Sequence, residues 1–178
     1  MAMVTQDNKA LVNRYIDEVF NNRNLAAIDE FLSPDLVDHT LPPSLPQNIV
    51  GTKQAVIMFL NAFPDLRITV DEAIAEGDRV AVRYTSHGTQ RGSFAGIPPM
   101  GREITVQSYI SARIADGKIV EMWGLDDQVG LLRQLGVIPA MFGFVFFAGL
   151  GAGIGLSVLL GKVFTSIANT RSTRTNVA

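Results

Sequence analysis

Asp127 is the residue of this sequence best suited to act as a general acid or base. It follows Trp123 and Leu125 at intervals of two residues, so a strand that continues this far places all three side chains on one face. Apolar surroundings raise the pKa of a carboxylate, which suits it to removing a proton beside a carbonyl group. A structural role is the alternative: Asp126 or Asp127 caps the helix that follows.

His39 is the second candidate for catalysis, and His87 is a weaker candidate for contact with a substrate. In the sequence PDLVDH, strand spacing puts Val37 and His39 on one face and Asp38 on the other. A neutral imidazole can hydrogen-bond a substrate carbonyl or position the base. The alternative for both histidines is that each is an ordinary polar residue at the rim of a pocket or at the edge of the domain. The residues that alternate with His87 are apolar and indicate the core face of its strand.

Several aromatic residues could form the apolar wall of a substrate pocket. They are spaced as expected for one face of a helix or strand, and ordinary core packing is the alternative for each. The candidates for substrate binding are Tyr15, Phe59, Phe63 and Trp123, with Met122 beside the last. A buried Tyr15 would also need a hydrogen-bonding partner for its hydroxyl.

Composition argues against a metal, a cofactor or nucleic acid as a partner. The chain of 178 residues has no cysteine, and its two histidines lack metal-binding spacing. It also lacks a glycine-rich phosphate loop and a GxSxG nucleophile elbow. Residues 1–139 contain 12 Lys and Arg against 17 Asp and Glu, a net charge of −5 that would repel a phosphate backbone. The expected partner is therefore a hydrophobic small molecule.

The elements that would position these residues are helices first and strands second. Apolar residues recur at helical spacing early in the chain and alternate at strand spacing later, and turns containing Asp and Gly join the strands. This order predicts an α+β fold with an antiparallel sheet covered on one face by helices. The expected helices span residues 11–20, 24–32, 52–63 and 127–136, and the expected strands 66–75, 79–89, 103–114 and 118–127.

Several phrases, in order, resemble the SnoaL-like polyketide cyclases of the nuclear-transport-factor-like fold superfamily. They include PDLVDH, FPDL, EGDRVAVR, GIPPMG, ADGKIVEMW and GLLRQLG, within residues 7–136. The resemblance implies a conical, barrel-like curved sheet wrapped around N-terminal helices, with an apolar pocket in its mouth. It also implies intramolecular aldol closure of a polyketide-like keto ester, with an aspartate as general acid/base and no cofactor. Asp127 matches the family's aspartate ahead of GLLRQLG.

Two other functions compete with catalysis. The same cone can bind an apolar ligand or support a dimer without turnover, because a fold does not determine a function. In the third possible function, the domain is tethered to a membrane and serves as an interaction partner for another protein. We expect a homodimer in any case, since the open face of the sheet would otherwise be an exposed apolar patch.

The C-terminal part of the chain has a different character. Ala140–Gly161 is a run of 22 uncharged residues, whose helical length of about 33 Å matches the ~30 Å core of a bilayer. We therefore expect a domain over residues 1–139, a transmembrane helix over 140–164 and a short basic tail over 165–178. The alternative is a buried helix or an oligomer seam. With no signal peptide in view, the domain is expected to be cytoplasmic and anchored to the membrane by this single helix.

Overall fold

The computed structural model describes residues 2–137, in which one early strand lies among the N-terminal helices, four more strands follow and a short helix comes last. A π-helical turn, Asp17–Asn21, extends the first helix, and a 3-10 turn, Leu25–Ala27, precedes the second. The elements are α1 (Ala2–Ile16), α2 (Ile28–Phe31), β1 (Leu32–Asp38), α3 (Ile49–Ala62), β2 (Arg67–Glu76), β3 (Arg79–Thr89), β4 (Glu103–Ala115), β5 (Lys118–Asp126) and α4 (Gln128–Gln134). The predicted α+β class is confirmed.

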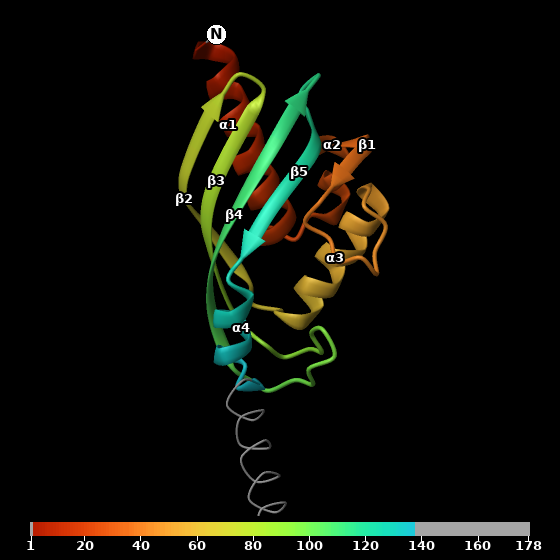
Figure 1. The fold of residues 1–178 in the computed structure, drawn as a ribbon, viewed down its shortest axis with the longest axis vertical. Helices are drawn as coiled ribbons and strands as arrows, with labels where there is room; N and C mark the ends of the chain where they lie inside the picture. The colour runs from red at the N-terminus through yellow and green to blue at the C-terminus, as the bar shows by residue number, and fades with distance from the viewer. Residues whose placement is uncertain (1, 138–178) are drawn as a thin grey trace, which may run out of the picture. The chain divides into compact units, whose positions relative to one another are not determined.

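The sheet is mixed and open, which corrects the expectation of a purely antiparallel, barrel-like sheet. Its strand order is β1-β5-β4-β3-β2, so β1 and β2 form two free edges (Figure 1). Strands β2 to β5 pair antiparallel, but β1 pairs parallel with β5, with Leu32 opposite Ile119 and Asp38 opposite Met122. The sequence did not indicate this pairing, because a parallel partner so far along the chain is not joined to β1 by a short turn.

Tight turns join the long strands as predicted. Asp116 and Gly117 connect β4 to β5 with φ values of 50° and 70°. Positive φ at both central residues is the mark of a type I′ turn, whose twist matches that of the strands. Gly77, with φ of 58°, serves the turn between β2 and β3. Both predicted hairpins are confirmed.

One face of the sheet, called here the inner face, packs against the helices. α1 contacts β2 and β3, and α3 contacts β1 (Figure 1). The inward side chains of the strands are apolar and buried, as expected for a face covered by helices. They include Val80, Val82, Ile104, Val106, Ala112 and Ile114. The opposite, outer face carries the residues that alternate with these.

Helix α3 begins earlier than the sequence indicates. The side chain of Asn48 caps it by accepting hydrogen bonds from the amides of Val50 (3.0 Å) and Gly51 (3.3 Å). Thr52, the expected start, lies in the first turn of the helix. Its hydroxyl is therefore available to Asp38 at 2.7 Å, which ties α3 to the end of β1.

None of the helices within residues 2–137 is long and apolar enough to cross a membrane. The predicted transmembrane helix at 140–164 and the basic tail at 165–178 lie outside the described residues. The membrane anchor and the location of the domain therefore stay predictions.

Candidate functional site

Asp127 caps helix α4. Strand β5 ends at Asp126, and the exposed Asp127 carboxylate accepts a hydrogen bond from the amide of Gly130 at 2.8 Å. A Cβ on Gly130 would lie 2.0 Å from an Asp127 oxygen, so a larger residue there would displace the capping carboxylate. The capping alternative is thus what the structure shows, and the expected apolar surroundings of Asp127 are not present. Its role as a base stays a prediction.

Trp123 and Leu125 share a face, but it is the outer one. Leu125 is 78% exposed, whereas Met122, on the opposite face, is buried. The inward positions of β5 are therefore Met122, Gly124 and Asp126. The predicted shared face of Trp123 and Leu125 is confirmed, but Asp127 does not join it, because β5 ends at Asp126 and Asp127 caps the helix that follows.

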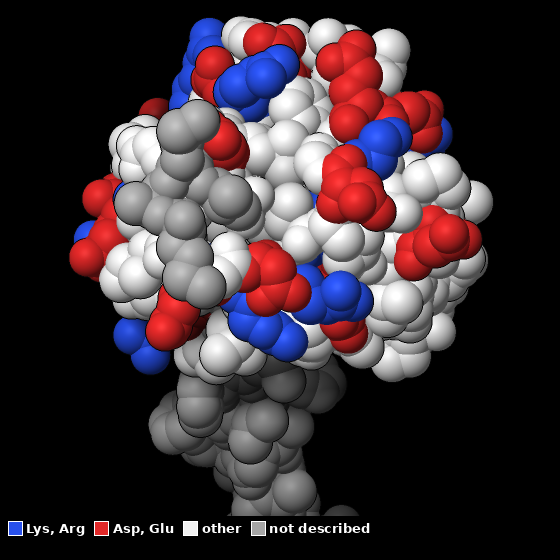
Figure 2. All heavy atoms as spheres, turned by 90° about the horizontal axis from the view of Figure 1, so that it is seen from above, with Lys and Arg blue, Asp and Glu red and all other residues white. Residues whose placement is uncertain are grey.

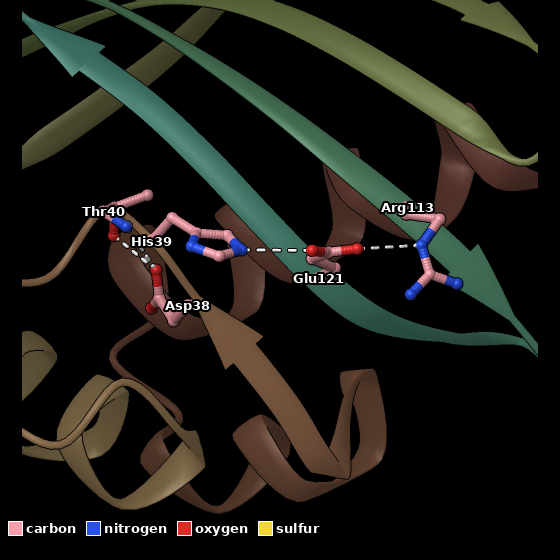
Figure 3. Close-up of polar contacts among 5 residues, drawn as sticks. All are labelled: Asp38, His39, Thr40, Arg113 and Glu121. Atoms are coloured by element: carbon pink, nitrogen blue, oxygen red, sulfur yellow. Dashed lines mark hydrogen bonds and ion pairs between the residues drawn. The ribbon is translucent and has the colours of Figure 1, made fainter.

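His39 also lies on the outer face, just beyond the end of β1 (Figure 3). Its Nε2 is 3.1 Å from Oε1 of Glu121, and Nε of Arg113 donates to Oε2 of the same carboxylate at 3.0 Å. The hydrogen bond from His39, followed by that from Arg113, lowers the pKa of Glu121. The imidazole stacks on the ring of Trp123, with centroids 5.1 Å apart. This chain of contacts orients His39 along the surface, away from the inner face.

Asp38 points the opposite way, as the alternation in PDLVDH predicts (Figure 3). It is only 1% exposed. Its carboxylate accepts hydrogen bonds from the amide (2.9 Å) and hydroxyl (2.6 Å) of Thr40 and from the hydroxyl of Thr52 (2.7 Å). Sequence reasoning noted this orientation but did not count Asp38 as a candidate. Thr40 lies two residues away, but Thr52 lies fourteen residues away, so no local pattern indicated that Asp38 is buried.

Two phenols share the interior with carboxylates. Burial, and then the negative charge of Asp38, raise the pKa of Tyr15 well above its usual value. Burial also raises the pKa of Tyr84 to about 12, with a smaller contribution from Asp126, while a hydrogen bond from Ser108 acts in the other direction. Both phenols therefore remain hydrogen-bond donors throughout the physiological pH range. Sequence analysis named Tyr15 as a candidate for substrate binding, but it did not name Tyr84.

Phe59 and Phe63 belong to an aromatic cluster at the end of α3. Their ring centroids lie 5.0 Å apart, and Phe94 packs against them at 5.7 and 5.4 Å. Phe63 is fully buried, and Phe59 and Phe94 are partly exposed. Phe94 comes from the loop after β3, which buried Gln90 holds through hydrogen bonds to three backbone groups of that loop. The cluster is primarily core packing.

His87 is exposed on the outer face, where its Nδ1 lies 2.9 Å from the hydroxyl of Thr105. The structure therefore does not bring it together with Tyr15. The buried neighbours Val80 and Val82 confirm that the core face of β3 is the opposite one. Within residues 2–137, no group of three acidic or histidine side chains is arranged to hold a metal ion.

An open hollow of about 510 Å³ lies on the outer face of the sheet. Its apolar side chains are Ile74, Tyr109, Trp123 and Leu125, and strands β2 to β5 each contribute to it. Three of these four residues are more than half exposed. The hollow is therefore separate from the phenols and carboxylates of the inner face.

Comparison with known proteins matches the SnoaL-like polyketide cyclase family over residues 10–135. TsrD from Streptomyces laurentii is 29% identical with a TM-score of 0.68, over 74% of this chain and 96% of that chain. IdmH from Streptomyces antibioticus is 35% identical with a TM-score of 0.61, over 68% and 94%. AclR from Streptomyces galilaeus is 31% identical with a TM-score of 0.64, over 75% and 87%. No curated protein matches the sequence. The chain belongs to the SnoaL-like polyketide cyclase family.

Proposed function

We propose that the protein is a cofactor-free enzyme of cyclase or isomerase type, acting on a hydrophobic, polyketide-like keto ester. Family membership supports the reaction class. The observation that carries the proposal is the pairing of two protonated phenols, Tyr15 and Tyr84, with the carboxylates Asp38 and Asp126 on the inner face. A carboxylate accepts a proton from carbon, and a phenol stabilises the charge that develops on oxygen, as in ketosteroid isomerase.

The reaction is an intramolecular aldol closure. A base removes a proton from the carbon beside a carbonyl, and the electron pair moves onto the carbonyl oxygen as an enolate. The enolate carbon then attacks a second carbonyl carbon of the same chain, whose oxygen takes up a proton. One carbon–carbon bond forms, no atom is lost and no electron is transferred to another molecule. The chemistry therefore needs only acid/base groups and a site that folds the substrate.

The test is turnover of synthetic β-keto esters that carry a second carbonyl and a hydrophobic chain. We expect the purified full chain to give ring-closed product of unchanged mass, detected by chromatography and mass spectrometry. Dialysis against a chelator should leave the rate unchanged. Absence of ring-closed product across the whole series would contradict the proposal.

A non-catalytic module that binds an apolar ligand is the second candidate, favoured by one observation. Asp127, the family-matched aspartate, is engaged with the amide of Gly130 rather than directed into the interior. In that case native mass spectrometry should detect a hydrophobic small molecule retained by the purified protein. The same compound would be recovered unchanged after prolonged incubation.

We further propose that a second copy of this chain covers the outer hollow. Its lining is mostly apolar but includes Glu72 and Arg83, and the ion pairs Arg83–Asp71 and Arg113–Glu121 neutralise charges in and beside it. Figure 2 looks onto one end of the domain, where acidic and basic side chains are interspersed. A hollow whose charges are paired can pack against the same hollow of a second copy without charge repulsion. A two-fold axis between the copies would bring the two hollows face to face.

A charge placed in this hollow should separate the copies. Leu125→Glu is expected to convert a dimer into a monomer, because a carboxylate would have to be buried in an apolar interface. Met58→Glu on α3, also at an exposed apolar residue, is the matched control and should remain dimeric. Light scattering after size-exclusion chromatography of the full chain in detergent measures the protein mass. A wild-type protein of monomeric mass would contradict this assembly.

A further inference from the structure

A polar row crosses the largely apolar inner face of the sheet. Tyr84 on β3 pairs with Ser108 on β4, which in turn pairs with Asp126 on β5. Residues directly opposite one another in antiparallel strands direct their side chains to the same face. Ser108 is buried, so this shared face is the inner one. The sheet thus brings a phenol, a hydroxyl and a carboxylate into one line.

The row on one side, Ser86 and Val106, carries a further buried hydroxyl, whereas the rows on the other side are apolar. The next row on the apolar side consists of Val82, Ile110 and Gly124, and the one beyond it of Val80, Ala112 and Met122. Apolar walls beside a polar row favour a substrate that is largely hydrocarbon and carries a few oxygens. A hydrophobic keto ester fits this description.

Asp126 is the inner-face carboxylate that remains open to a substrate. Asp38 is buried and already accepts three hydrogen bonds. Asp126 is exposed, and within the described part of the chain no hydrogen bond occupies its carboxylate. Tyr84 lies two strand spacings away, about 10 Å between backbones, with Ser108 on the strand between them.

We propose that Asp126 is the acid/base of the reaction and that Tyr84 donates a hydrogen bond to the substrate's carbonyl oxygen. This inference rests on the proposed function. The Asp126 carboxylate takes the proton from the carbon beside the carbonyl, and the electron pair moves onto the oxygen held by Tyr84. After the enolate carbon has bonded to the second carbonyl carbon, the resulting alkoxide takes the proton back from Asp126. In this assignment Asp127, one residue later, serves to cap helix α4.

The two adjacent aspartates provide a matched pair of variants. Asp126→Asn removes the base with little change of shape, and Asp127→Asn removes the other carboxylate while keeping a residue that caps helices well. The readout is exchange of the proton between the carbonyls of ethyl 3-oxodecanoate for deuterium, followed by NMR as the excess over buffer alone. We expect Asp126→Asn to slow this exchange by about 10²–10⁴-fold, and a loss of this size in Asp127→Asn instead would assign the base to the other carboxylate.

A second measurement separates chemistry from structure. Circular dichroism should show Asp126→Asn folded like the wild type, and ultraviolet titration should show a lower pKa for Tyr84, because the charge that helps to raise it is gone. Wild-type exchange that persists in Asp126→Asn overturns the assignment alone. Wild-type exchange no faster than buffer overturns the proposed function with it. A Tyr84 titration unmoved by Asp126→Asn overturns the juxtaposition itself.

Discussion

Raising the pH from 10 to 12 is expected to lower the free energy of unfolding by about 4 kcal/mol through Tyr15 and Tyr84 together. Both phenols have pKa values raised in the folded chain above the value of 10.0 for a free tyrosine, to about 12 for Tyr84 and higher for Tyr15. The folded state therefore holds these two protons where the unfolded state has released them. The stabilisation is complete below pH 10 and is lost as the pH rises through the folded pKa values. Urea unfolding at a series of pH values measures it.

Tyrosine-to-phenylalanine variants identify the source of this alkaline instability. Tyr84→Phe and Tyr15→Phe should each remove about half of the pH dependence between pH 10 and 12, since each eliminates one of the two titrating groups. An unfolding free energy that is flat across this range in the wild type would rule out burial of both phenols.

Phe63→Ala is expected to lower the free energy of unfolding by about 3–5 kcal/mol. The side chain is fully buried and packs against Phe59 and Phe94, so its removal leaves a cavity that the end of α3 cannot fill. Met58→Ala, at an exposed neighbour on the same helix, should cost far less. Thermal and urea unfolding give the difference.

The same variant tests the predicted role of Phe63 in substrate binding. If the ring serves only as core, the folded fraction of Phe63→Ala should keep nearly the substrate affinity of the wild type. Wild-type stability combined with a strongly raised KM would show instead that Phe63 forms part of the substrate wall.

Local patterns predicted much of the architecture. The alternation of residues 66–127 identified four strands, and the Asp116–Gly117 pair identified a tight turn. Family phrases predicted a fold that the comparisons confirm. Each of these features depends on residues close together in the chain, which is why a single sequence reveals them.

The errors concern which face of the sheet is covered and where a strand ends. The spacing of Trp123 and Leu125 is correct, but spacing alone does not say which side the helices occupy. The end of β5 at Asp126 decides that Asp127 starts a helix, so a difference of one residue separates the inner-face carboxylate Asp126 from the capping carboxylate Asp127. The partner of β1 lies more than eighty residues away, so no local pattern contained it.

The parallel pairing of β1 with β5 also constrains the order of folding. β1 is made early, yet its only neighbour in the sheet ends at Asp126, near the end of the described domain. During synthesis both edges of β1 therefore stay unpaired until almost the whole domain has left the ribosome. The long loop between β1 and β5 also slows the docking of β1, because closing a longer loop costs more entropy. Asp38 and His39 therefore reach their final positions late, after the hairpins of β2 to β5 can have formed. Nascent chains cut short before β5 would leave β1 available for wrong pairing, which makes this strand the point where folding is most exposed to aggregation.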